Sequence, residues 1–127
     1  MFQNLDFFQT AGAMARHAGT RQAVVAQNIA NADTPNFRAL EMASFRDVYD
    51  SNVAKGMSAT RSKHLHGQQI AFEQAGVTFS LSEPAPNGNS VSLEDEVLQS
   101  VNVSREHSRA LAIYRHGMTV LRSTLGR

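Results

Sequence analysis

Cysteine is absent from the 127 residues, and this absence excludes disulfide bonds, thiolate-bound metals and cysteine-based catalysis together. An excess of charge of one sign is also lacking, because 12 Lys and Arg are balanced by 11 Asp and Glu, for a net charge of +1. Such a chain has no basic block with which to neutralise a phosphate backbone. We therefore expect no nucleic-acid binding.

Long apolar runs are missing as well. The longest one near the N-terminus, Ala23 to Ala26, is far too short to cross a bilayer, and the residues before it include Asp6 and no apolar signal-peptide segment. We therefore expect neither a cleaved signal peptide nor direct membrane insertion. The hydrophobic content of 42% still allows a single modest core.

Motifs for catalysis or ligand binding are not found either. The sequence has no Gly-x-Ser-x-Gly turn, no glycine-rich phosphate loop and no Glu-x-x-His pair for a metal site in a helical bundle. His64 and His66 have no third metal ligand close by, and Glu94 to Glu96 are explained as complements of a helix dipole. We predict no enzymatic activity, no cofactor and no bound metal.

What the chain does have is a three-four spacing of seam positions at both ends, which is typical of coiled-coil helices. It predicts one helix over residues 4–32 and a second from residue 93 to the end of the chain. Ser92 is a suitable N-cap for the second helix, with Asp95 three residues later. The seam positions are Phe8, Ala11, Ala15, Ala18, Gln22, Val25, Ile29 and Ala32, followed by Leu93, Val97, Ser100, Ser104, His107, Leu111, Tyr114, Met118, Leu121 and Leu125.

Both predicted seams are thin. The first is rich in alanine, with Gly12 and Gly19 beside it, and the second is polar from Ser100 to His107, so its register there must be held by something other than apolar burial. We expect the largest apolar burial at Leu111, Tyr114, Met118 and Leu121. Because seams of this kind bury too little to offset chain entropy, the helices should depend on neighbouring subunits.

The middle of the chain has no sustained period. Ser44 to Val53 predicts a short helix that packs through Phe45 and Tyr49, and Val77 to Leu81 alternates as a strand does. Residues 55–69 read as a mobile loop, and Pro84, Pro86 and Asn87-Gly88 mark turns.

The predicted fold is therefore mainly α, with two long terminal helices in a coiled-coil hairpin around a small irregular middle that holds a short helix and a candidate β-hairpin. Its segments are 1–33 (first helix), 34–91 (variable middle) and 92–127 (last helix).

The segment from Ala26 to Arg38 is the most specific part of the sequence. Three asparagines and Thr34-Pro35 end the first helix near Asn31 to Asp33, which is more specification than a helix stop requires. The segment resembles the N-terminal signature of the flagellar basal-body rod and hook family, Ala-Asn-x-x-Thr-Pro-Gly-Tyr, with Asn36 and Phe37 in place of Gly and Tyr. Asparagine accepts left-handed backbone angles almost as glycine does.

The resemblance extends to Pro86 through Glu94, ahead of the last helix. On this basis we expect Asn28, Asn31 and Thr34 to hold the turn through side-chain to backbone hydrogen bonds. The assembly motif that the resemblance implies comprises Asn28, Ile29, Ala30, Asn31, Thr34, Pro35, Asn36, Phe37 and Arg38.

In function, the resemblance implies a structural subunit of the proximal rod of the flagellar basal body, exported to the periplasm by the flagellar type III apparatus without a cleaved signal. Its partners would be further copies of itself, FlgC-like rod subunits and a FliE-like adaptor at the export gate and MS ring. A soluble helical adaptor or regulator that docks one partner through its C-terminal helix is the alternative. The stoichiometry distinguishes the two: a rod subunit should form a filament or ring with like subunits, whereas an adaptor should form a defined one-to-one complex.

Overall fold

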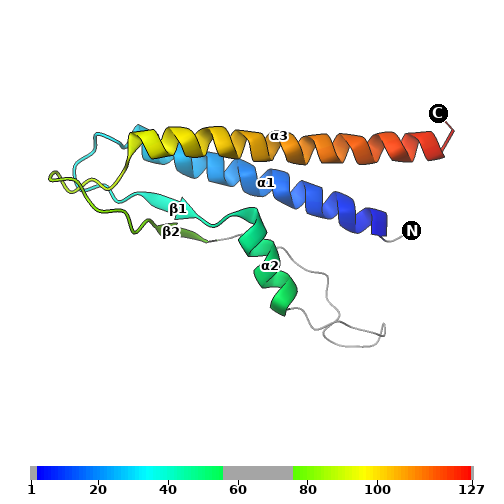
Figure 1. The fold of residues 1–127 in the computed structure, drawn as a ribbon, viewed down its shortest axis with the longest axis horizontal. Coiled ribbons are helices and arrows are strands. Elements are labelled where there is room, and N and C mark those ends of the chain that lie inside the picture. The colour runs from blue at the N-terminus through cyan, green and yellow to red at the C-terminus, as the bar shows by residue number, and fades with distance from the viewer. Residues whose placement is uncertain (1–2, 56–75, 127) are drawn as a thin grey trace.

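A computed structural model describes residues 3–55 and 76–126 of the chain. Two long antiparallel helices, α1 (Gln3–Ala30) and α3 (Leu93–Thr124), lie side by side, so that both termini are at the same end of the molecule (Figure 1). Between them in sequence come β1 (Leu40–Met42), α2 (Phe45–Lys55) and β2 (Val77–Phe79). This arrangement confirms the predicted fold class, whereas the predicted loop beyond Lys55, with His64 and His66, lies outside the described residues.

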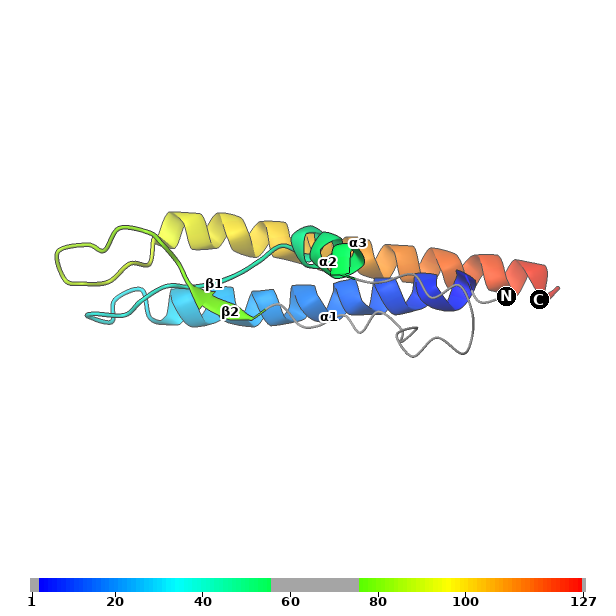
Figure 2. The same ribbon diagram turned by 90° about the horizontal axis from the view of Figure 1, so that it is seen from below.

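The strands and α2 lie on one side of the helical pair, and α2 runs away from it, so that it is seen nearly end-on in the turned view (Figure 2). Within the described ranges, no helix combines the length and the apolar character needed to cross a membrane. The molecule is therefore a long hairpin with a small attachment on one side.

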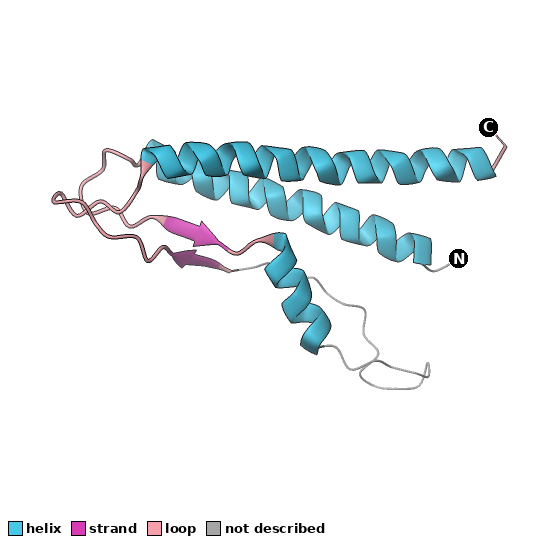
Figure 3. Cartoon of the chain, in the orientation of Figure 1, coloured by secondary structure: helices cyan, strands magenta, loops and turns pink. Residues whose placement is uncertain are grey.

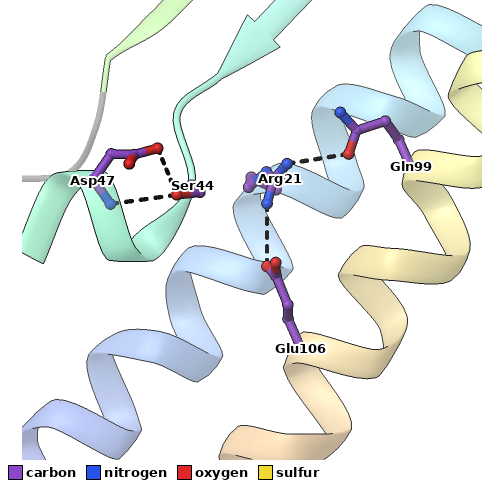
Figure 4. A network of polar contacts seen from close by, with 5 residues as sticks. All are labelled: Arg21, Ser44, Asp47, Gln99 and Glu106. Carbon is purple, nitrogen blue, oxygen red and sulfur yellow. Dashed lines mark hydrogen bonds and ion pairs between the residues drawn. The ribbon is translucent and has the colours of Figure 1, made fainter.

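Serine caps begin both later helices. Ser92 has extended backbone angles and its hydroxyl accepts a hydrogen bond from the Asp95 amide at 3.4 Å, as the sequence predicted. Ser44 accepts from the Asp47 amide at 3.3 Å and donates to the Asp47 carboxylate at 2.6 Å (Figure 4). Because Ser44 is the cap, α2 begins one residue after the predicted start.

The two strands form a small antiparallel sheet in which Leu40 faces Phe79 and Met42 faces Val77. The predicted strand at residues 77–81 is thus observed as Val77–Phe79. Its partner is not adjacent in sequence, since α2 lies between the two strands, and the sequence did not predict a strand at Leu40–Met42. The sheet is therefore closed by a long-range contact rather than by a tight hairpin turn.

The interface between α1 and α3 uses the predicted seam of α1. Ala11, Ala18 and Val25 are buried, and Phe8, Ala15, Gln22 and Ile29 are half-buried. Opposite them on α3, Val103 and Ala110 are completely buried. The apolar core is therefore one narrow stripe along the hairpin.

The predicted seam of α3 does not coincide with this interface. Val103 and Ala110 each precede a predicted seam position by one residue, which corresponds to a rotation of about 100°. Met118 and Leu121 are half-buried, but Leu111 and Tyr114 are 37% and 43% exposed. Within the single chain, the largest apolar burial is thus not at the residues expected to carry it; Leu93, Val97 and Leu125 are still more exposed, at 49%, 50% and 79%.

Polar contacts explain the rotation and hold the register of the polar stretch. Arg21 binds Glu106 (Nη1 to Oε2, 3.1 Å) and donates from Nη2 to Gln99 Oε1 at 3.1 Å (Figure 4), and Gln22 Nε2 donates to Ser100 Oγ at 3.0 Å. These contacts turn the face of α3 that carries Gln99 and Glu106 toward α1. The expected polar contacts are thus present, but Val103 within the same stretch is completely buried, so apolar burial contributes there as well.

A double-mutant cycle of Arg21→Met and Glu106→Gln should give a coupling energy of about 1 kcal/mol in urea unfolding, because both partners are largely shielded from water. The matched control is the exposed pair Arg46 and Asp50, whose atoms are 3.9 Å apart. Its coupling should stay below about 0.5 kcal/mol. Equal couplings for the two pairs would contradict a register role for Arg21.

Near the open end of the hairpin, a glycine of α3 lets two aromatic rings of α1 pack directly against the α3 backbone. A Cβ atom placed on Gly117 would lie 2.7 Å from a ring carbon of Phe7 and 3.0 Å from ring carbons of Phe8. The Phe8 ring in turn packs edge-on against Tyr114, with ring centroids 5.2 Å apart. By contrast, Gly19 has open space where its Cβ would be, so no neighbour in the described part of the chain requires a glycine there.

Candidate functional site

The residues with the most specific sequence pattern gather at the closed end of the hairpin, where the chain leaves α1 and later enters α3 (Figure 3). We call residues 28–40 together with 85–96 the joint. Two segments far apart in sequence meet there through backbone bonds: the Asn36 amide donates to the Asn87 carbonyl at 3.1 Å, and the Ser90 amide donates to the Phe37 carbonyl at 3.1 Å. The structure thus brings the assembly motif and the segment before α3 together.

Asn28 is the most buried polar residue of the joint, with 1% of its surface exposed. Its side-chain amide makes two hydrogen bonds with the backbone of Leu40. Nδ2 donates to the Leu40 carbonyl at 2.7 Å, and Oδ1 accepts from the Leu40 amide at 2.9 Å. The amide therefore pairs with the free edge of β1 as a neighbouring strand would. Its second N–H donates to Glu96 Oε1 at 2.8 Å, which ties α1 to the first turn of α3.

The carboxyl group of Glu96 responds to this partly buried position. Burial raises the pKa of Glu96 above its ordinary value, and the nearby carboxylates of Asp95 and Glu41 act in the same direction, whereas the hydrogen bond from Asn28 lowers it. The Asn28 amide therefore offsets part of the cost of holding a carboxylate here.

Asn31 and Thr34 form the turn that follows α1. Asn31 Nδ2 donates to the Gln27 carbonyl at 2.8 Å, and Thr34 Oγ1 donates to Asn31 Oδ1 at 3.2 Å. Asn28 and Asn31 thus both make side-chain to backbone bonds, although Asn28 bonds Leu40 in β1 and not the turn; that these residues hold the turn stays a prediction. The Thr34 hydroxyl instead holds the side chain of Asn31, so the two residues act together.

Asn36 has the left-handed backbone expected at the position where the family signature has glycine, with φ of 59°. Gly88 opposite it also has a positive φ, 78°, and a Cβ atom there would lie 2.3 Å from Asn36 Oδ1. The two segments approach each other this closely because residue 88 has no side chain.

The other motif residues differ in their surroundings. Arg38 places its guanidinium 4.6 Å from the centre of the Phe79 ring, which connects the motif to β2. Ile29 and Phe37 are half-buried, whereas Ala30 and Pro35 are exposed. The ring of Pro35 therefore adds little to the core of the single chain.

Asn89 is the joint residue that sequence reasoning missed. It is 3% exposed, and its Nδ2 lies within 2.8–2.9 Å of three backbone carbonyl oxygens, those of Asn31, Ala32 and Thr34. In the sequence it follows the Asn87-Gly88 turn pair and is not distinguished from an ordinary turn residue. Its only signal was its place in the second segment of the family resemblance.

The hydrogen bonds of the joint join groups of the chain to one another. The buried side-chain amides of Asn28 and Asn89 bind backbone groups and Glu96. In the described part of the chain, no group of three or more His, Asp or Glu side chains is arranged to hold a metal ion. The cavity next to the joint, about 160 Å³, is lined by residues such as Arg21, Ser90 and Glu96.

His17 is a second buried polar residue of α1, outside the joint. It is 8% exposed and packs edge-on against the Phe45 ring of α2, with ring centroids 5.6 Å apart. Burial lowers the pKa of His17 below 6.5, and the charge of Arg21 lowers it further, whereas Glu106 and the Ala43 backbone act in the opposite direction. The packing of α2 on the hairpin is therefore coupled to a neutral imidazole.

Stability should fall as the pH decreases from about 7 through 6.5 and below, because the unfolded state binds the His17 proton more readily than the folded state. The His17→Phe variant keeps the ring contact and should lose this part of the pH dependence in chemical unfolding. Glu96, with its raised pKa, contributes with the opposite sign, so the difference between wild type and variant at each pH isolates His17. Exposed His107, replaced by Asn, is the control; if both variants lose the same pH dependence, His17 is not the responsible group.

The structure is a helical hairpin closed at one end by a polar joint, whose turn has the sequence Ala-Asn-x-x-Thr-Pro. Comparisons with known sequences identify the class of protein to which it belongs. Residues 10–38 match the family described as Flagella basal body rod protein. The flagellar basal body rod protein FlgB of Agrobacterium fabrum is 33% identical over 113 residues, which cover 83% of this chain and 81% of that protein. The chain therefore belongs to the family of flagellar basal body rod proteins.

Other relatives have the same name. FlgB of Salmonella typhimurium is 28% identical over 114 residues, covering 83% of this chain and 77% of that protein. FlgB of Escherichia coli is 27% identical over 100 residues, covering 72% of each. The similarity to these FlgB proteins extends well beyond the signature segment and includes most of the chain.

Proposed function

We propose that this chain is a structural subunit of the proximal flagellar rod that assembles through α1 and α3, with the joint fixing the angle at which the chain leaves the helical shaft. The observation that carries the proposal is the exposed apolar flank of α3. Leu93, Val97, Leu111 and Tyr114 occupy predicted seam positions and remain 37–50% exposed in the single chain. They form two exposed apolar pairs, one on each side of the polar stretch from Ser100 to His107. Exposed apolar patches are typical of surfaces that bind other proteins.

The finer assignments rest on the family resemblance. They are export by the flagellar type III apparatus without a cleaved signal, a periplasmic position in the rod, and contacts with like subunits, FlgC-like rod proteins and a FliE-like adaptor. The burial pattern supports such contacts, because several apolar positions of the predicted α3 seam, among them Leu93, Val97 and Leu111, stay exposed once α1 and α3 have paired. Neighbouring helices would cover that flank and make the shaft stiff enough to transmit torque.

Replacing both Asn31 and Thr34 with Ala should abolish rod assembly and swimming while export continues. The reason is that the two side chains together form the turn after α1, and its loss changes how the chain leaves the shaft. The measurements are motility in soft agar and the amount of the protein in secreted and hook-basal-body fractions. The double replacement of Asn102 and Thr119, both exposed on α3, is the control; normal swimming of the Asn31 and Thr34 variant would refute the role of the turn.

Fractionation tests the proposed function as a whole. The chain should copurify with hook-basal bodies in many copies. A defined one-to-one complex with a soluble partner would instead favour the helical adaptor.

A further inference from the structure

The side-chain amide of Asn89 lies where three carbonyl groups of the turn after α1 converge. Nδ2 is 2.9 Å from the Asn31 oxygen, 2.8 Å from that of Ala32 and 2.9 Å from that of Thr34. These carbonyl groups belong to the turn after α1, where the Asn31 oxygen also accepts from the Thr34 amide at 3.0 Å and the Thr34 oxygen from the Phe37 amide at 3.3 Å. An amide has two N–H groups, so two of these oxygens share one of them.

Asn89 is itself held rigidly, which makes it an effective clamp. Its side-chain Oδ1 accepts from the Val91 backbone amide at 2.7 Å. Its backbone amide donates to Asn87 Oδ1 at 3.0 Å, and its backbone carbonyl accepts from the Ala85 amide at 2.7 Å. Every polar atom of the residue therefore has a partner. The side chain cannot turn away from α1 without breaking the loop that leads into α3.

We propose that Asn89 is a positioning residue for rod assembly: it caps the turn that follows α1 from the segment that enters α3, and so fixes how the two helices leave the joint. This inference rests on the proposed function as a rod subunit. Asn28 and Glu96 tie the two helices together within their last and first turns. Asn89 adds a second tie beyond the helix ends, and two separated ties resist rotation where one does not.

The cap requires a donor, which separates it from simple packing. The carbonyl groups at a helix C-terminus have negative partial charge, so a carboxylate of the same shape as the amide would be repelled there. A residue that only fills space would tolerate Asn89→Asp better than Asn89→Ala. A residue that donates hydrogen bonds would show the reverse order.

The experiment compares full-length Asn89→Asp, Asn89→Ala and the control Asn102→Asp by backbone hydrogen exchange. We expect exchange at the amides of residues 31–34, 36, 37 and 90 to rise by about tenfold or more in Asn89→Asp and less in Asn89→Ala, while amides in the middle of α1 and α3 change little. Lowering the pH should reverse the effect in Asn89→Asp, because the protonated carboxyl regains a donor and its pKa is raised by the carbonyl groups. Tolerance of Asn89→Asp with damage in Asn89→Ala would overturn the cap.

Assembly is measured on the same variants by their amount in purified hook-basal bodies. We expect Asn89→Asp to fall at least about tenfold below wild type and the Asn102→Asp control to match wild type. If Asn89→Asp loosens the joint yet is incorporated normally, the positioning role is refuted while the rod function stands. If wild type itself is missing from hook-basal bodies, the proposed function fails and with it the assembly role of Asn89.

Discussion

Replacing Asn28 with Leu should lower the free energy of unfolding by about 2–4 kcal/mol, because it leaves the amide and carbonyl of Leu40 and one oxygen of Glu96 without their partner. Leucine has nearly the same size but no polar atoms, so the loss reports the hydrogen bonds rather than a cavity. Since small domains are stable by only about 5–15 kcal/mol, the change should be obvious in urea unfolding. β1 should lose its hold on α1 first, visible as faster hydrogen exchange at Leu40.

An aspartate at position 28 tests whether Asn28 must donate the hydrogen bond to Glu96. Asn28→Asp removes the donor and sets two carboxylates against each other, so it should destabilise at least as much as the leucine variant. Adding Glu96→Gln returns a donor from the side of α3 and should recover part of the loss. Asn102→Leu, on the exposed surface of α3, should change stability by less than about 0.5 kcal/mol. No recovery in the double variant would show that the contact between Asn28 and Glu96 contributes little.

The helical part of the fold was predictable because it depends on local signals. The three-four spacing located α1 and α3, Ser92 and Asp95 marked the start of α3, and the cluster of asparagines marked the end of α1. The rotation of α3 was not predictable. Arg21 and its partners on α3 stabilise it together with buried Val103 and Ala110, and a periodic pattern shows which residues are apolar but not which polar pairs will meet.

The joint was predictable only in part, for the same physical reason. The roles of Asn31 and Asn36 follow from neighbours within a few residues, so turn chemistry sufficed. β1 is only three residues long, and its edges are completed by β2 and by the Asn28 side chain. Asn89 caps carbonyl groups 55–58 residues earlier in the chain. Contacts of that range leave no period or spacing in the sequence.

Two apolar surfaces of α3 should respond in opposite ways to the same kind of substitution. Leu93→Ser with Val97→Ser removes side chains that are 49% and 50% exposed, so the monomer should lose only about 1–2 kcal/mol and keep its helices. Val103→Ser places a hydroxyl at a fully buried position of the interface with α1, and should cost about 2–4 kcal/mol in the monomer. Circular dichroism with urea unfolding measures both.

In assembly, the Leu93 and Val97 double variant should be the more damaging one, although it affects the monomer less than Val103→Ser does. If the exposed flank is the surface that neighbouring subunits cover, the Leu93 and Val97 double variant should be secreted at wild-type levels but be missing from hook-basal bodies and leave cells non-motile. Leu98→Ser is the matched control, because Leu98 is 64% exposed but lies outside the predicted seam. Equal loss of assembly in this control would mean that the whole outer surface of α3 binds neighbours, and normal incorporation of the double variant would remove the flank from the assembly surface. Because each neighbour would bury the same row on the next subunit, even a modest loss per contact is repeated along the shaft, so assembly should fail before the monomer does.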